Sequence, residues 1–190
     1  MEIVLASGSP RRKQLLDMLG MDFTVHPASG EEILPPGAGP EETVCLLSAQ
    51  KAGAVAALYP PETVIIAADT IVWHQGTILG KPRDARDAAR MLAGLSGCTH
   101  QVFTGVTVRK GEQVLTAAEM TQVRFRKLSG PEIDAYIATG EPMDKAGAYG
   151  AQGLASLFVT GIDGDFFNVM GLPMRRLSTM LKPFGVDVLS

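Results

Sequence analysis

One stretch joins a strand, a turn and a helix start, and it decides the fold: Glu2-Ile3-Val4-Leu5-Ala6-Ser7-Gly8-Ser9-Pro10-Arg11-Arg12. The apolar run predicts a buried strand, and a helix is expected from Arg11 to Leu19. Ser9 is a suitable N-cap, Pro10 is a suitable first helical residue, and Gly20 is a suitable stop. Such a turn directs free backbone N–H groups and the positive end of the helix dipole to one place, which favours binding of an anion.

Hydroxyl and guanidinium groups are concentrated at the same turn. Ser7 lies within it, and Arg11 and Arg12 follow it. Arginine forks match pairs of phosphate oxygens, so these three residues are candidates for phosphate binding. The pattern is not the Walker A loop, which needs GxxxxGK[ST]. The alternative is an ordinary capped helix whose arginines are solvated.

The rest of the chain mixes strands and helices without an internal repeat or a clear linker. Strands are expected at residues 2–6, 23–26, 63–68, 101–109, 113–126 and 157–160, with a hairpin at 71–79. Helices are expected at residues 11–19, 41–58, 84–95, 129–139 and 173–181. This order predicts an α/β (or α+β) fold with a mixed sheet, in one domain over residues 1–190 that has two lobes.

Composition narrows the class of protein. The chain has 190 residues, of which 46% are hydrophobic and 19% charged, with a formal net charge of -3. A packed core is expected, and the absence of a basic surplus disfavours a nucleic-acid binder. No apolar run is long enough to span a membrane, and the start does not resemble a signal peptide. Cys45 and Cys98 lack the spacing of a zinc site, so a cytoplasmic protein with reduced thiols is predicted.

Four further residues are candidates for chemistry. Lys51 falls on the apolar face of its helix, where it either extends to the rim or points into a site. Asp69 follows an apolar strand, a position where a carboxylate holds a metal or accepts a proton in many α/β proteins, although it also suits a turn. Lys81 is presented by a Gly-Lys-Pro turn. Glu32 is one of two adjacent loop acids, which bind a divalent cation in some proteins and are simply solvated in most.

Residues 141–153 form an unusual segment. Three glycines, two acids, a lysine, a tyrosine and a glutamine occur within these thirteen residues. Glycine lets a backbone approach a ligand, and Gln152 offers a donor and an acceptor in fixed geometry. A long irregular segment of this kind is frequently functional, and otherwise it is a plain connection.

Together these segments closely resemble the Maf family of nucleotide pyrophosphatases. The matching stretches occur in the family's order over almost the whole chain: Ala6 to Arg12, Lys51-Ala52, Ala68-Asp69-Thr70, Gly80-Lys81-Pro82, His100 to Val106, Glu141 to Gly153 and Asn168 to Pro173. The resemblance implies a two-lobed Maf- and ITPase-like α/β fold with a long central cleft, often as a homodimer. It also implies hydrolysis of a nucleoside triphosphate to the monophosphate and pyrophosphate, with a divalent cation (Mg²⁺ or Mn²⁺).

The resemblance also implies roles for individual residues. Asp69 matches the family's catalytic acid, and Glu32 matches its metal-side glutamate, although Ser29-Gly30-Glu31-Glu32 departs from the aspartate-rich form usual in relatives. The phosphate-facing positions match Ser7, Arg11, Arg12, Lys51 and Lys81. The positions associated with substrate choice match Arg12, Thr70 and Gln152, and they look like the dTTP/UTP subfamily.

Three alternatives are weighed against this function. A paralogue acting on 7-methyl-GTP is disfavoured by Thr70 and Gln152. A non-enzymatic nucleotide-binding regulator of cell division is disfavoured because Asp69, Lys51 and Lys81 are all present, and a pure binder needs no acid to activate water. A nucleic-acid binding module lacks a basic face with interleaved aromatic residues.

Overall fold

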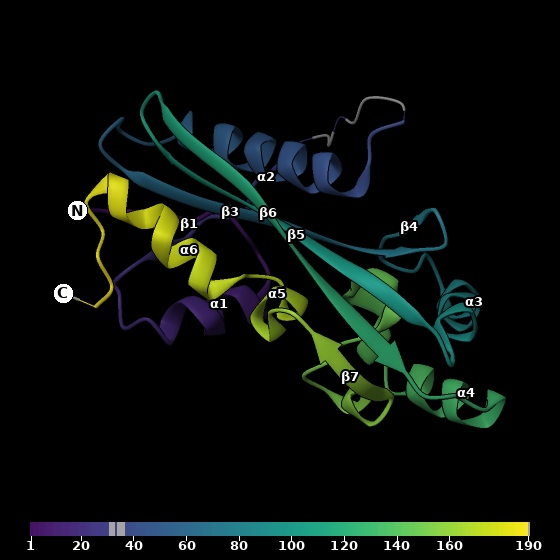
Figure 1. Cartoon of the computed structure of the whole chain (residues 1–190). Helices are drawn as coiled ribbons and strands as arrows, with labels where there is room; N and C mark the ends of the chain where they lie inside the picture. The colour runs from purple at the N-terminus through teal and green to yellow at the C-terminus, as the bar shows by residue number, and fades with distance from the viewer. Residues whose placement is uncertain (31–32, 34–36, 190) are drawn as a thin grey trace. The chain divides into compact units, whose positions relative to one another are not determined.

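The computed structural model describes the chain except residues 31–32, 34–36 and 190. Its strands and helices follow one another as Figure 1 shows. The strands are β1 (Ile3–Leu5), β2 (Thr24–Val25), β3 (Val64–His74), β4 (Thr77–Leu79), β5 (Thr99–Lys110), β6 (Gln113–Phe125) and β7 (Val159–Asp163). The α-helices are α1 (Pro10–Asp17), α2 (Pro40–Ala56), α3 (Ala85–Leu95), α4 (Gly130–Ala138), α5 (Phe166–Met170) and α6 (Met174–Leu181).

The strands form one mixed sheet, which confirms the predicted α/β class. Its order is β2-β1-β3-β5-β6-β7, and β4 pairs with β3. β1 lies parallel to both β2 and β3, whereas β4 runs antiparallel to β3 and β7 runs antiparallel to β6. The predicted hairpin is confirmed, with Gln75 and Gly76 at positive φ in its turn. Positive φ at both central residues is typical of tight hairpin turns.

The chain divides into two compact units, each assembled from separate stretches. Unit 1 comprises residues 1–69, 104–119 and 171–190, and unit 2 comprises residues 70–103 and 120–170. Three long strands therefore change unit along their length, because the boundaries fall within β3, β5 and β6. No helix in the part of the chain that the structure describes is long and apolar enough to cross a membrane.

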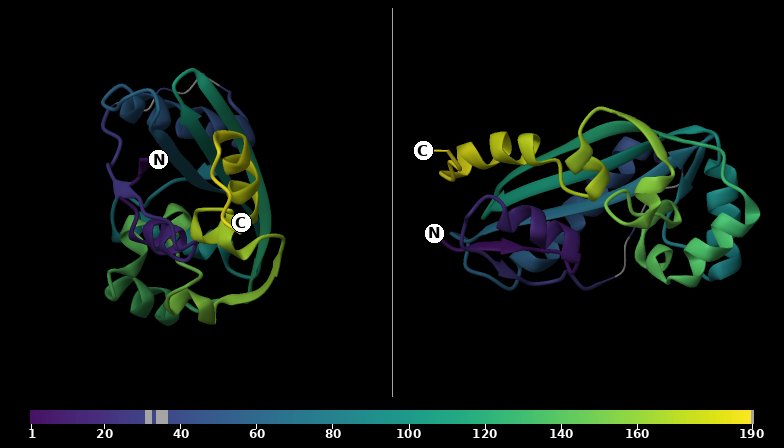
Figure 2. Two further views of the ribbon diagram at one scale, coloured as in Figure 1. Left: turned by 90° about the vertical axis from the view of Figure 1, so that its left-hand side faces the viewer. Right: turned by 90° about the horizontal axis from the view of Figure 1, so that it is seen from below.

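In unit 1, helices cover both faces of the strands. Figure 1 shows α2 on one face, and Figures 1 and 2 show α1 and α6 on the other. The α2 side is packed from small and β-branched side chains, among them Ala52, Val55 and Ile65. Gly105 of β5 lets the helix approach closely, since a Cβ built there would lie 2.1 Å from the backbone oxygen of Val44. This close approach sets the height of α2 above the sheet.

In unit 2, one hydrophobic cluster joins the strands to α3 and α4. It includes Leu92 of α3, Ile133 of α4, and an aromatic group formed by Phe125, Tyr149 and Phe158. The Phe125 ring meets the Tyr149 ring edge to face, with 4.8 Å between centroids. Edge-to-face pairs of this kind are the preferred aromatic arrangement and fix the rings in place. Tyr149 therefore ties the segment 141–153 into the core of unit 2.

Two sequence predictions need correction, and one short helix was missed. The strand predicted at residues 63–68 extends to His74, so Asp69 lies inside β3 rather than at its carboxyl end. The apolar run stops before the strand does, because β3 continues into the hairpin with β4. Residues 154–157 form a 3-10 turn, so β7 begins two residues later than predicted, and the short helix α5 was not predicted.

Candidate active site

The predicted anion-binding turn has the expected local geometry. Ser9 is the N-cap of α1, and Pro10 is its first residue. The Ser9 hydroxyl accepts a hydrogen bond from the backbone N–H of Arg12 at 3.5 Å. The Ser7 hydroxyl accepts one from the backbone N–H of Ser9 at 3.3 Å. These two hydrogen bonds thus hold the turn against the first residues of α1.

Arg12 turns back over this loop. Its Nη1 donates to Ser7 Oγ at 3.2 Å, and its Nε donates to the carbonyl of Gly171 at 2.7 Å. Gly171 has a φ of 111°, which a residue with a side chain rarely adopts. Burial lowers the pKa of Arg12, the Asp69 carboxylate opposes that shift, and Arg11 adds to it. The structure therefore brings Asp69, which the sequence had proposed separately, to the turn that carries Ser7 and Arg12.

Asp69 is also the partner of Lys51. The Lys51 ammonium donates to Asp69 Oδ1 in an ion pair. The two side chains are 22% and 13% exposed, so the pair is screened from water but still reachable. Lys51 therefore points toward Asp69 and does not extend to a solvated rim, which was the alternative. Asp69 also lies three residues beyond Ile66, which pairs with the last residue of β1. The carboxylate is thus beyond the end of β1, although not of β3.

Three of the predicted residues belong to unit 2. Thr70 directly follows Asp69 in β3 and is partly buried, whereas Lys81 and Gln152 are exposed. A backbone hydrogen bond of 3.0 Å runs from Gly147 N–H to the carbonyl of Gly80. It links the segment that carries Gln152 to the turn that carries Lys81. Glu32 lies outside the described residues.

The segment 141–153, called here the Gly-rich segment, is held by side chains rather than by regular structure. Tyr136 Oη donates to Glu141 Oε1 at 2.9 Å, and Glu141 Oε2 accepts from the backbone N–H of Leu154 at 3.1 Å. Tyr136 Oη also accepts from the N–H of Gly150 at 3.2 Å. One carboxylate and one phenol thus close the segment into a loop at both of its ends.

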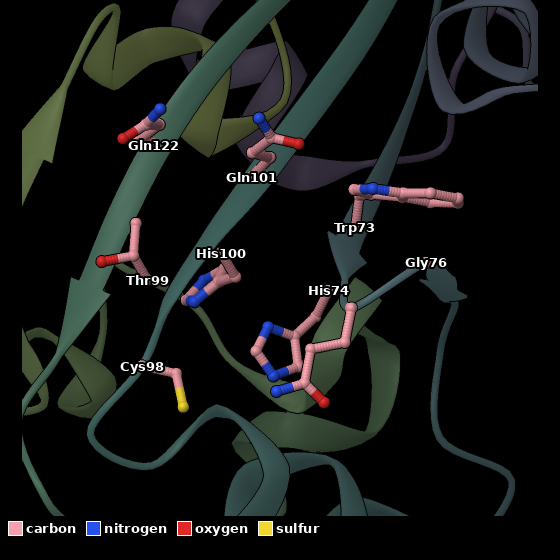
Figure 3. Close-up of a pocket in the computed structure, with 9 residues that line it drawn as sticks. Trp73, His74, Gly76, Cys98, Thr99, His100, Gln101 and Gln122 are labelled. Carbon is pink, nitrogen blue, oxygen red and sulfur yellow. The ribbon is translucent and has the colours of Figure 1, made fainter.

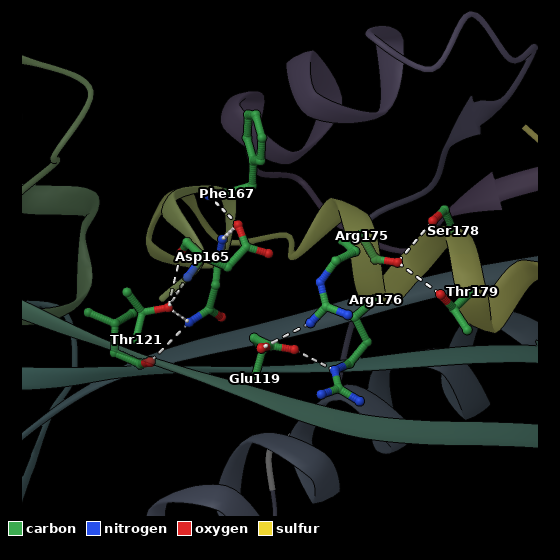
Figure 4. Close-up of polar contacts among 10 residues, drawn as sticks. Glu119, Thr121, Asp165, Phe167, Arg175, Arg176, Ser178 and Thr179 are labelled. Carbon is green, nitrogen blue, oxygen red and sulfur yellow. Dashed lines mark hydrogen bonds and ion pairs between the residues drawn. The ribbon is translucent and has the colours of Figure 1, made fainter. Parts of the chain in front are cut away.

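Sequence reasoning missed these supporting residues. Glu141 and Lys145 were read only as part of a composition, yet Lys145 Nζ donates to the carbonyl of Glu141 at 2.7 Å. A second unpredicted contact lies in unit 1, where Glu119 of β6 forms ion pairs with both Arg175 and Arg176 of α6 (Figure 4). No spacing rule predicts a contact between a strand and a helix so far apart in sequence.

The donors available for a metal ion are limited. Among the described residues there is no group of three or more His, Cys, Asp or Glu that could hold one. Asp69 is a partly buried carboxylate, and carboxylate oxygens are the ligands that Mg²⁺ and Mn²⁺ prefer. The chemistry of Asp69 therefore fits such an ion.

The profile of the family described as "Maf-like protein" matches residues 2–184. The chain belongs to the Maf family. A Maf relative from Bacillus cereus (strain AH187), named dTTP/UTP pyrophosphatase, is 46% identical over 187 residues, which is 98% of this chain and 97% of the relative. A Bacillus cytotoxicus relative of the same name is 48% identical over 183 residues, 96% of this chain and 95% of the relative.

A solved structure, that of the Staphylococcus aureus Ham1 protein, is more distant from this Maf chain. Its TM-score is 0.45 at 16% identity, and the match covers 66% of this chain and 72% of that one.

Proposed function

We propose that this chain hydrolyses dTTP and UTP to the monophosphate and pyrophosphate. The observation that carries the proposal is its near-full-length identity of 46% and 48% to Maf relatives named dTTP/UTP pyrophosphatase. The gathering of Ser7, Arg12 and Asp69, with Lys51 paired to Asp69, supports it.

The phosphates are bound by cationic side chains. A triphosphate carries about four negative charges, so a protein with a net charge of -3 must concentrate its positive groups to hold it. Arg11 and Arg12 follow the anion-binding turn, and Lys51 and Lys81 complete the set. Each charge-assisted hydrogen bond contributes about 1.5–3 kcal/mol. Ser7 keeps the Arg12 guanidinium directed over the turn.

Asp69 is the residue proposed to act on water. Attack by water on the α-phosphorus forms one P–O bond, breaks the bond to the bridging oxygen, and releases pyrophosphate. Asp69 accepts the proton of that water or, in the alternative role, would hold a metal together with Glu32. A divalent ion would supply neutralisation of phosphate charge. Because Lys51 is paired with Asp69, it also keeps a positive charge beside the reacting oxygens.

The base is selected by hydrogen bonding. Uracil and thymine present a carbonyl, an N–H and a carbonyl in a row. The Gln152 amide donates to a carbonyl and accepts from the N–H, and Thr70 and Arg12 are the other selecting residues. Cytosine presents an amino group and a bare nitrogen instead, and leaving a polar group unpaired costs about 1–3 kcal/mol. The rates of dTTP and UTP hydrolysis should therefore exceed the rate of CTP hydrolysis by about tenfold or more.

A substrate panel tests the proposal. Purified protein is given dTTP, UTP, CTP, ATP, GTP or 7-methyl-GTP with Mg²⁺ or Mn²⁺, and products are separated by ion-exchange chromatography. Monophosphate plus pyrophosphate is expected, fastest from dTTP and UTP. Diphosphate plus phosphate would contradict the chemistry, and faster cleavage of GTP or 7-methyl-GTP would contradict only the base assignment. Absence of turnover for every substrate would favour a nucleotide-binding regulator. A homodimer and a cytoplasmic location remain predictions.

A further inference from the structure

One stretch that matches the Maf family, His100 to Val106, has no role in the function proposed above. Its glycine is explained by packing, because Gly105 lets α2 approach the sheet. Its histidine has no such explanation. His100 is 2% exposed, and it lies in the part of β5 that belongs to unit 2. A histidine is seldom buried this completely unless its ring has a hydrogen-bond partner. The partner of His100 therefore indicates what the residue does.

That partner belongs to the Gly-rich segment. His100 Nε2 lies 2.7 Å from the Tyr149 hydroxyl, in a buried hydrogen bond. His100 and Gln101 point to opposite faces of the sheet, as successive strand residues do, and Figure 3 shows both side chains. The face on which His100 meets Phe125 packs against the cluster around α3 and α4. The bond therefore connects β5 to the Gly-rich segment within unit 2.

Packing holds the two rings of this bond in place. The centroids of the His100 and Tyr149 rings are 5.3 Å apart, and the Phe125 centroid lies 5.0 Å from the first and 4.8 Å from the second. All three pairs meet edge to face in a packed core, which leaves little room for a ring to turn. His100 Nδ1 has no partner among the described residues. Within that part of the chain, hydrogen bonding of the buried ring is thus limited to Tyr149.

Both partners are neutral at pH 7. Burial, with a smaller effect of His74, lowers the pKa of His100 to about 4. Burial, with a smaller effect of Tyr136, raises the pKa of Tyr149. The bond therefore has one proton to share, and neither partner carries a charge that would favour its exposure to water.

The backbone next to Tyr149 needs such an anchor. Ala148 is fully buried and has a φ of 59°, a conformation that residues with a Cβ seldom adopt. Gly147 before it has a φ of 69°, and a Cβ built there would lie 2.8 Å from Val72 Cγ2. A strained conformation persists only where the surrounding contacts enforce it. The bond between Tyr149 and His100 is directly adjacent and supplies one such constraint.

The same anchor affects where Gln152 lies. Gly150 follows Tyr149 directly, and its N–H donates to Tyr136 Oη at 3.2 Å. Gln152 comes two residues later and is exposed, so the position of its amide depends on the backbone on either side. Before Gln152 that backbone is fixed through Tyr149 and Gly150, and after it through Glu141.

We propose that His100 is a positioning residue for base selection, which acts through Tyr149 and fixes the backbone that presents Gln152. This role rests on the proposed function, because Gln152 is the residue proposed there to select the base. His100 itself is too deeply buried to reach a base, so it acts through its hydrogen bond. Loss of that bond should leave the chemistry at the phosphates in place and impair the choice between UTP and CTP.

Tyr149→Phe tests the bond most directly, since it removes one oxygen atom and keeps the ring. The ratio of kcat/KM for UTP to that for CTP should fall by about three- to tenfold, the range expected for loss of one hydrogen bond. The kcat for UTP should change less than this ratio. His100→Leu should have the same effect. His100→Gln should retain most of the preference, because its amide can still bond the Tyr149 hydroxyl. The double variant Tyr149→Phe/His100→Leu should be no worse than the more affected single variant, because both changes remove the same bond.

Hydrogen–deuterium exchange gives a readout that does not depend on activity. Amides of residues 141–153 should exchange faster in Tyr149→Phe than in the original chain. The matched control is Thr107→Val, on the same strand but in unit 1, which removes hydrogen bonds of 2.9 Å to the hydroxyls of Ser48 and Thr116. This control should lower the melting temperature without changing either the exchange of residues 141–153 or the base preference.

Unchanged exchange in Tyr149→Phe would overturn the anchor, and faster exchange with an unchanged UTP to CTP ratio would overturn the role in base selection. Additive effects in the double variant would show that His100 and Tyr149 act separately, which would also overturn it. Failure of the proposed function looks different, because the original chain would then show no preference for UTP in the substrate panel. In that case, exchange alone decides whether His100 anchors the segment.

Discussion

Two regions of this molecule present candidate site residues in opposite ways. The turn from Ser7 to Arg12 is placed by regular elements, between a buried strand and a capped helix. The Gly-rich segment has only 3-10 turns, and its shape depends on Glu141, Tyr136 and Tyr149. The first region should therefore be disrupted by substitutions that disturb backbone packing. The second region should be disrupted by the loss of a single side-chain contact, while the fold is retained.

Gly105→Ala should destabilise unit 1, which contains the first region, most severely. The new Cβ would lie 2.1 Å from the backbone oxygen of Val44, and a backbone atom in a packed helix cannot swing aside. We expect a loss of about 3 kcal/mol or more in the free energy of unfolding, measured by urea denaturation. The control is Gly94→Ala at an exposed position in the last turn of α3, where nothing lies within 4 Å of a Cβ. That change should stabilise slightly, by about 0.5–1 kcal/mol. Equal stabilities for the two variants would contradict the packing argument.

Asp69→Asn sharpens the comparison, since it removes a charge that acts on Arg12 of the first region without disturbing the packing there. Turnover of UTP should fall by about a hundredfold or more, because amide oxygen is a poor base and a poor metal ligand. The circular dichroism spectrum should be unchanged. Near-normal turnover would remove Asp69 from the mechanism, and an unfolded variant would show that its pairing with Lys51 is needed for the fold.

Gly153→Ala is the counterpart in the second region. Its Cβ would lie 2.2 Å from Glu141 Oε1, but here the neighbour is the end of a side chain. Glu141 should move away and lose its bonds to Tyr136 and Leu154, which costs about 1 kcal/mol. The preference for UTP over CTP should fall several-fold, measured as the ratio of kcat/KM values, with a smaller change in kcat for UTP. An unchanged ratio would show that Gln152 does not depend on this anchor.

The smallest effect is expected from Glu132, which caps the helix that carries Tyr136. The hydrogen bond from Arg126, with two further bonds from Ser129, lowers the pKa of Glu132 from 4.5 to about 2. A carboxylate with a lowered pKa stabilises the fold above pH 4.5, and this contribution is lost as the pH falls toward 2. Melting temperatures of Glu132→Gln should therefore vary less with pH over that range. Asp134→Asn, at an exposed acid two residues further on, is the control, and an identical slope in both variants would refute the assignment.

The same contrast explains what could be predicted from sequence. Ser9 was expected to cap its helix and does, and the predicted helices at 84–95 and 129–139 begin with the N-caps Asp84 and Ser129. Such starts are predictable because capping depends on neighbours three residues away. The length of β3 was underestimated because its second half is stabilised by pairing rather than by its own apolar residues.

Contacts between distant residues could not be predicted in this way. The bond from Arg12 to Gly171 spans 159 positions, and that from His100 to Tyr149 spans 49. Such contacts depend on tertiary structure, which no local pattern contains. For the Gly-rich segment the composition indicated a function, but the anchors that shape it became visible only in three dimensions.

The discontinuous make-up of unit 1 bears on how the protein is synthesised. Its stretches come from residues 1–69, 104–119 and 171–190, so its last helix, α6, is made after all of unit 2. The hydrogen bond from Arg12 to the carbonyl of Gly171 can therefore form only after Gly171 has been synthesised. By then, α1 could have formed long before. Contacts of such high sequence separation form slowly. We expect a nascent chain that ends before residue 171 to remain sensitive to protease in unit 1.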